Sequence, residues 1–141
     1  MPTVERFEDL EVWKRARELA NMIYDISEAG TFARDYGLRE QMRRAAISIL
    51  SNIAEGFESR TQALFIEFLG RAKASAGELR AQLYIAIDRR HITQDQFDMS
   101  SKLVETCSKQ ITRFMQYLET KPNARRILEE GAFYDVDTQS F

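Results

Sequence analysis

Apolar residues recur at intervals of three and four over most of the chain, which is the spacing of one face of an α-helix. The recurrences fall into four long stretches separated by short segments. They predict helices over residues 9–29, 36–56, 60–89 and 93–120. Because short connections favour antiparallel neighbours, the pattern predicts an all-α fold, an up-down-up-down antiparallel four-helix bundle with a short C-terminal extension.

Local signals mark where these helices begin and end. Gly56 follows the second apolar stretch and is interpreted as its C-cap, a position that favours glycine. The third and fourth helices each start with a capping-box pattern, in which a hydroxyl residue is followed three positions later by glutamine. The two pairs are Ser59 with Gln62 and Thr93 with Gln96.

The second predicted helix carries apolar residues on more than one side. Beside the stripe expected for a core-facing surface, Ile47 and Leu50 form a second apolar stripe, next to the uncharged Ser48 and Asn52. A helix packed on one side needs only one stripe, so the pattern predicts that a second copy of the chain covers these four residues. The alternative is that Ile47 and Leu50 are exposed, because protein surfaces also carry apolar atoms.

A line of small residues follows one side of the third predicted helix: Gly70, Ala74, Gly77 and Ala81. Glycine inside a helix costs up to about 1 kcal/mol relative to alanine. Two glycines on one line therefore indicate close packing of a neighbouring helix. The alternative is that one of these glycines lies on an exposed side, where nothing packs against it.

The pattern changes after the fourth helix, so we assign residues 1–120 to the bundle and residues 121–141 to a tail. Pro122 suits a first helical position, which predicts a short helix over residues 122–130 that ends at Gly131. Aromatic and acidic residues follow. Packing on a bundle groove, packing on a neighbouring subunit and terminal disorder stay open as alternatives for this tail.

Residues for catalysis are scarce. His91 is the only histidine and falls in a predicted loop, so the paired histidines of a di-iron bundle are missing. Cys107 lies on the apolar stripe of the fourth helix and is interpreted as core packing. No glycine-rich phosphate loop is present. We therefore expect no enzymatic activity, no metal and no cofactor.

Two further absences bear on location. No signal peptide is visible at the N-terminus, and no apolar run approaches the roughly 20 residues that cross a membrane. A single cysteine fits a reducing compartment. The sequence therefore predicts a cytoplasmic protein with no membrane partner.

The net charge is −2, but the charge is unevenly distributed. Residues 39–90 carry nine basic and six acidic side chains, which gives +3 for the second and third helices. A basic face that repeats around an oligomer multiplies weak phosphate contacts. The predicted nucleic-acid-binding residues are Arg43, Arg44, Arg60, Arg71 and Lys73. The alternative is a solvated face with salt bridges along the helix.

Several blocks of the sequence match one known family. They are FEDLEVW from Phe7, YGL from Tyr36, QMRRAAISI from Gln41, SNIAEG from Ser51, FIEFL from Phe65 and GEL from Gly77. Over about residues 7–119 the chain resembles the four-helix-bundle family named for proteins encoded in intervening sequences of bacterial 23S ribosomal RNA genes. It departs from the family pattern at Ala33 and Leu50, where proline is usual.

The resemblance implies a ring-shaped homopentamer without established enzymatic activity. A related branch looks like the accessory protein of diversity-generating retroelements, a pentamer that associates with a reverse transcriptase and with nucleic acid. The positions that match such binding are Arg43, Arg44, Arg60 and Arg71. We therefore expect a non-enzymatic oligomeric scaffold that binds RNA, or a nucleic-acid-handling protein, through a basic face. The alternative is a protein-interaction module without a nucleic-acid role.

Overall fold

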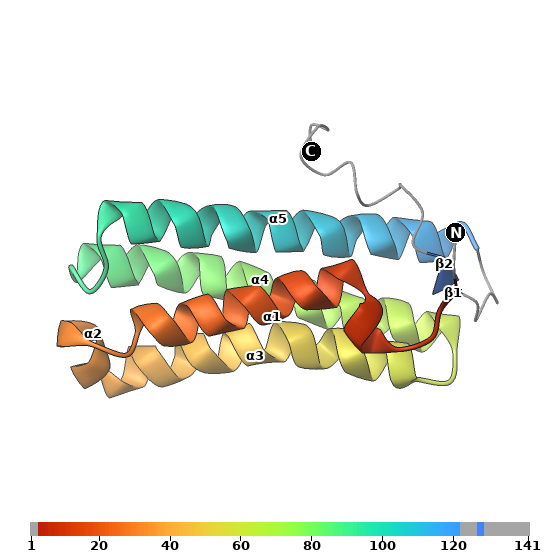
Figure 1. The fold of residues 1–141 in the computed structure, drawn as a ribbon, viewed down its shortest axis with the longest axis horizontal. Helices are drawn as coiled ribbons and strands as arrows, with labels where there is room; N and C mark the ends of the chain where they lie inside the picture. Colours follow the sequence, from red (N-terminus) through yellow and green to blue (C-terminus); the bar gives the residue numbers. More distant parts are fainter. Residues whose placement is uncertain (1–2, 122–126, 129–141) are drawn as a thin grey trace.

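The computed structural model describes residues 3–121 and 127–128. Its four long helices lie side by side (Figure 1): α1 (Glu11–Ile26), α3 (Tyr36–Glu58), α4 (Gln62–Asp88) and α5 (Gln94–Glu119). α3 packs against α1 and α4, and α5 packs against α4 and α1. Successive long helices run in opposite directions, which confirms the predicted all-α, up-down-up-down bundle.

Short elements occupy the ends of the bundle. A 3-10 turn, η1 (Phe7–Asp9), precedes α1, and α2 (Gly30–Arg34) forms where the sequence predicted a loop. The two-residue strands β1 (Thr3–Val4) and β2 (Ile127–Leu128) pair in antiparallel register. The helix predicted over residues 122–130 is therefore wrong at the β2 positions. Its other residues, and residues 131–141 of the predicted tail, lie outside the described residues.

The predicted apolar stripes form one continuous core between the four helices. Its largest fully buried side chains are Leu10, Leu19, Ile23, Phe32, Met42, Ile49, Ile53, Phe65, Leu69, Leu79 and Phe114. Cys107 is also fully buried, and burial raises the pKa of its thiol to about 12. A thiol in this state stays protonated and unreactive near neutral pH, which confirms its interpretation as a core residue.

Gly56 has a different role from the predicted one. α3 continues past it to Glu58, so Gly56 is a buried residue inside the helix and not a C-cap. A Cβ atom at this position would lie 2.8 Å from Cδ1 of Phe65 and 2.9 Å from Cβ of Phe68. Only glycine therefore allows α3 and α4 to approach this closely, and the small residue serves packing between helices.

The predicted capping boxes have different outcomes. Thr93 caps α5 with both hydrogen bonds of the motif: its hydroxyl accepts from the Gln96 amide at 3.1 Å, and the Gln96 side chain accepts from the Thr93 amide at 2.9 Å. The box at Ser59 is wrong, because Thr61 caps α4 and accepts from the Leu64 amide at 3.1 Å.

No helix of the same chain packs closely on the two glycines of the predicted line on α4. A Cβ atom at Gly77 would meet no atom within 4 Å, and one at Gly70 would meet only Cε of Met115, at 3.8 Å. Close packing at this line is therefore wrong for the single chain. The line belongs to the outer side of α4, where Ala74, Gly77 and Ala81 are exposed.

A polar link joins α3 to the connection between α4 and α5. Asp35 caps α3 by accepting from the Leu38 amide at 3.2 Å, and its other carboxyl oxygen lies 2.9 Å from Nε2 of His91. Nδ1 of His91 lies 2.8 Å from the Thr31 hydroxyl, and its ring stacks on Phe32 with centroids 5.2 Å apart. The bond with His91, followed by the bond with the Leu38 amide, lowers the pKa of Asp35.

We predict that Gly56→Ala destabilises the bundle by about 1–3 kcal/mol, because the added methyl group overpacks the contact with Phe65 and Phe68. The measurement is urea unfolding followed by circular dichroism. The matched control is Gly37→Ala in the same helix, where a Cβ meets no atom within 4 Å. We expect this control to be neutral or more stable, by up to about 1 kcal/mol. A Gly56→Ala variant as stable as the wild type would contradict the close approach.

We predict that the stability lost in Asp35→Ala depends on pH. The folded-state pKa of Asp35 is lowered, so its contribution is present above the ordinary Asp pKa of about 3.9 and disappears as the pH falls through the folded value. Urea unfolding at pH 7 and pH 3 should show a gap between wild type and variant that narrows in acid. Asp35→Asn, which keeps an oxygen for the cap but cannot ionise, is the control. A gap of equal size at both pH values would disprove the assignment.

Candidate functional site

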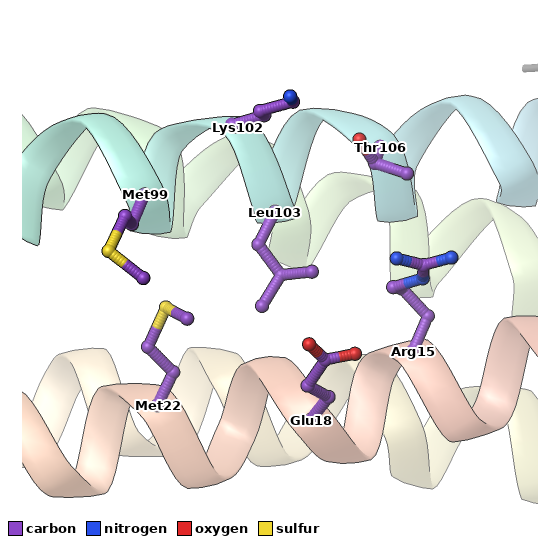
Figure 2. A pocket seen from close by; sticks show the side chains of 7 residues that line it. All are labelled: Arg15, Glu18, Met22, Met99, Lys102, Leu103 and Thr106. Atoms are coloured by element: carbon purple, nitrogen blue, oxygen red, sulfur yellow. The ribbon is translucent and has the colours of Figure 1, made fainter. Parts of the chain in front are cut away.

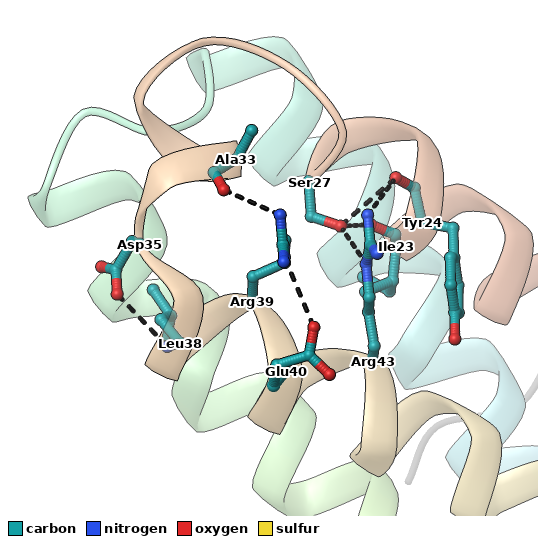
Figure 3. A network of polar contacts seen from close by, with 9 residues as sticks. All are labelled: Ile23, Tyr24, Ser27, Ala33, Asp35, Leu38, Arg39, Glu40 and Arg43. Atoms are coloured by element: carbon teal, nitrogen blue, oxygen red, sulfur yellow. Dashed lines mark hydrogen bonds and ion pairs between the residues drawn. The ribbon is translucent and has the colours of Figure 1, made fainter.

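The predicted nucleic-acid-binding residues were expected to share one face of the second and third predicted helices, which are α3 and α4. Arg43 does not belong to such a face, because it turns toward α1 (Figure 3). Its Nε donates to the hydroxyl of Ser27 at 2.9 Å, and its guanidinium lies over the ring of Tyr24, 4.4 Å from the centroid. Ser27 is fully buried and donates to the Ile23 carbonyl at 2.6 Å. Arg43 therefore links the C-terminal end of α1 to α3.

Arg39 has a similar structural role one turn earlier. Its Nη1 donates to the Ala33 carbonyl at 2.8 Å, and its Nε lies 3.5 Å from the carboxylate of Glu40 (Figure 3). The guanidinium also covers the ring of Tyr36 at 4.9 Å. Two arginines of the basic stretch are thus used to hold α1 and α2 against α3.

The two predicted basic residues of α4 also have partners within the chain. Arg71 pairs with Glu67 one turn away at 3.0 Å and lies over the ring of Phe68 at 5.0 Å. Nζ of Lys73 donates to the Thr112 hydroxyl at 2.6 Å, so this side chain reaches toward α5. Both pairs are exposed, and such surface contacts are worth at most about 1 kcal/mol each.

Arg44 and Arg60 are exposed and form no ion pair within the described part of the chain. Lys73 forms no ion pair there either, but its ammonium group is held by the Thr112 hydroxyl. Arg44 lines a shallow hollow of about 430 Å³ together with Arg43 and Ile47. Arg60 lies in the connection between α3 and α4. The predicted residues are therefore distributed over several sides of α3 and α4 and do not form one patch.

The predicted oligomer interface is largely satisfied within one chain. The Ser48 hydroxyl lies 2.8 Å from that of Ser75 on α4, and Nδ2 of Asn52 donates to the Ser48 carbonyl at 2.8 Å. Leu50 is half-buried against the core, whereas Ile47 is 40% exposed. Because α3 lies between α1 and α4, its two-sided pattern has a cause inside the bundle. A second copy at these residues stays a prediction.

A surface that includes most of the predicted line of small residues lies along α4. We call it the outer face of α4 and define it by its exposed apolar and small residues: Ala63, Leu64, Ala74, Gly77, Ala81, Tyr84 and Ile85. Tyr84 and Ile85 are 57% and 50% exposed. The line of small residues was the sequence signal for this face, but the large apolar residues Tyr84 and Ile85 beside it were not recognised as part of the same surface.

Two absences concern the part of the chain that the structure describes. Within residues 3–121 and 127–128, no three His, Cys, Asp or Glu side chains are grouped as metal ligands would be. None of the helices in this part of the chain is long and apolar enough to span a bilayer.

Comparison with known proteins gives the family. Residues 8–113 match the family described as 23S rRNA-intervening sequence protein. The fold is similar to the crystal structure of a protein of unknown function from the S23 ribosomal protein family of Bacteroides thetaiotaomicron, with a TM-score of 0.68 and 23% identity. That alignment covers 74% of this chain and 98% of the other. No curated protein matches the chain. Since the family match spans most of its length, the chain belongs to the 23S rRNA-intervening sequence protein family.

Proposed function

We propose that this protein is a non-enzymatic scaffold that assembles with copies of itself, and that the outer face of α4 forms the contact. The observation that carries the proposal is the exposure of apolar and small residues along this helix. An apolar stripe on a helix is normally covered by a packing partner, yet α4 packs mainly against α3 and α5, and this stripe is exposed. A second copy would complete its environment.

The arrangement of residues on this face suits a helix of another subunit. Along the centre of the face lie the small residues Ala74, Gly77 and Ala81, which allow the backbone of a second helix to approach closely. Tyr84 and Ile85 add larger apolar groups at one end. Charged side chains such as Glu78 and Arg71 flank the line, as polar residues do around the centre of many interfaces.

This proposal also agrees with the ring-shaped homopentamer that the family resemblance implies. A closed ring needs each subunit to offer two different surfaces, because its contacts are heterologous. The outer face of α4 supplies one of them. Ile47 on α3, which remains exposed, marks a candidate for the second.

We predict that the wild-type protein is oligomeric at micromolar concentration and that Gly77→Glu combined with Ala81→Glu shifts it to monomer, because the carboxylates would be buried without partners. Light scattering coupled to size exclusion measures the mass, and circular dichroism verifies the fold. Asn21→Glu, an exposed change on α1, is the control. A wild-type monomer would refute self-assembly. If Ile47→Glu prevented assembly and the α4 variant did not, the contact between subunits would be assigned to α3 and not to α4.

RNA binding is a second candidate, and one observation favours it. Arg44 and Arg60 are exposed and form no ion pair within the described residues, so their guanidinium groups are available to phosphates. In an assembly these charges repeat on every subunit, and Arg71 and Lys73 add to them at the expense of weak surface pairs.

We predict that a structured RNA is retained at low salt and released steeply as salt is added, and that Arg44→Glu with Arg60→Glu abolishes this retention. Fluorescence anisotropy with a labelled RNA across a salt series provides the measurement. Arg17→Glu with Arg34→Glu, the same change in net charge at exposed positions of α1 and α2, is the control. Arg43 is left unchanged, because its loss would detach α1 from α3. Absence of binding at the lowest salt would leave the self-assembling scaffold without a nucleic-acid role.

A further inference from the structure

A groove of about 630 Å³ runs between α1 and α5, on the side of the bundle away from the contact of α3 with α4 (Figure 2). Met22 of α1 and Met99 of α5 approach each other across it, and Leu103 points into it from α5. Met99 is 62% exposed, whereas Leu103 is nearly buried. The groove therefore offers an apolar surface of flexible, polarizable side chains, which adapt well to aromatic groups.

The charges around this groove are mainly positive. Arg15 on α1 and Lys102 on α5 line it, against the single acid Glu18. Neither cation forms an ion pair within the part of the chain that the structure describes. A ligand that fits here combines an aromatic or aliphatic anchor for the methionines with carboxylates for Arg15 and Lys102.

The C-terminal sequence of this chain has that chemistry. Residues 129–141 carry four acidic side chains, Glu129, Glu130, Asp135 and Asp137, and no basic one. Three aromatic residues stand among them: Phe133, Tyr134 and Phe141. The segment therefore complements the groove in two ways: its carboxylates match the two cations, and its aromatic rings match the methionine side chains.

The position of β2 places residues 129–141 within reach of the groove between α1 and α5. β2 pairs with β1, which directly precedes η1 and α1, so β2 lies at the end of the bundle where α1 begins. The thirteen residues 129–141 span up to about 43 Å when extended. From Glu11 to Met22, α1 rises only about 17 Å. The segment is therefore long enough to follow α1 and α5 to Met99.

We propose that residues 129–141 bind in the groove between α1 and α5 of their own chain, with aromatic side chains on Met22 and Met99 and carboxylates beside Arg15 and Lys102. The segment then covers the exposed methionine pair and neutralises the two unpaired cations. It acts as an internal ligand, which any external partner of the same groove has to displace.

The test measures how fast hydrogen peroxide oxidises each methionine of the full-length protein, because a covered methionine reacts more slowly than an exposed one. We expect Met99 to react several-fold faster in Asp135→Lys with Asp137→Lys, and also in Phe133→Ser with Tyr134→Ser. Met115, which lies toward α4, is the internal reference and should keep its rate. Glu55→Lys with Glu58→Lys, the same charge change on exposed positions of α3, is the matched control. Equal Met99 rates in all variants would overturn the proposal.

A second measurement identifies the chain that supplies the segment. In full-length Met99→Cys with Tyr134→Cys, mild oxidation should form a disulfide within one chain, which changes mobility under denaturing conditions without increasing mass. The buried thiol of Cys107 does not compete, because its pKa of about 12 keeps it protonated. A disulfide between two chains would assign the groove to the C-terminal segment of a second copy. That result, like the absence of any disulfide, would overturn binding within one chain.

Discussion

The close approach of α3 and α4 at Gly56 sets the geometry of the bundle. Because Gly56 has no side chain, the ring of Phe65 lies directly on the backbone of α3. The same ring makes edge contacts with Phe57 and with Phe114, at centroid distances of 6.1 Å and 5.3 Å. One aromatic side chain thus joins α3, α4 and α5, and the positions of the outer surfaces follow from that contact.

The opposite end of α3 is held by polar contacts. Arg39, Arg43 and the pair of Asp35 with His91 connect α3 to α1, α2 and the α4–α5 connection. The cations in these contacts, Arg39 and Arg43, belong to the basic stretch in which the charge distribution predicts a nucleic-acid-binding face. The charge left for a partner is therefore smaller than the composition of α3 and α4 suggests, and the apolar outer face of α4 becomes the larger unexplained surface.

Periodicity was sufficient to predict the four long helices, whose ends all lie within three residues of the expected positions. The capping-box motif, which depends only on neighbours in sequence, identified the cap at Thr93 but selected Ser59 where Thr61 caps α4. The C-cap predicted at Gly56 was wrong, because a glycine after an apolar stretch suits both a helix end and a close contact, and only the position of Phe65 distinguishes them. The Ser48 and Arg43 interactions were missed for a related reason: a stripe shows which residues share a side but not what lies opposite.

The pairing of β1 with β2 has a consequence for how the chain can be rearranged. Thr3 lies opposite Leu128, so two segments from near the two ends of the sequence are adjacent at one end of the bundle. Folds with this property tolerate circular permutation, in which the old ends are joined and new ones are opened elsewhere. The connection between α4 and α5 is the favourable place to open it, because Arg90 has a φ of 61°, a left-handed conformation that non-glycine residues rarely adopt. A chain that starts at α5 and ends after α4 would keep every helix of the bundle and release that strain.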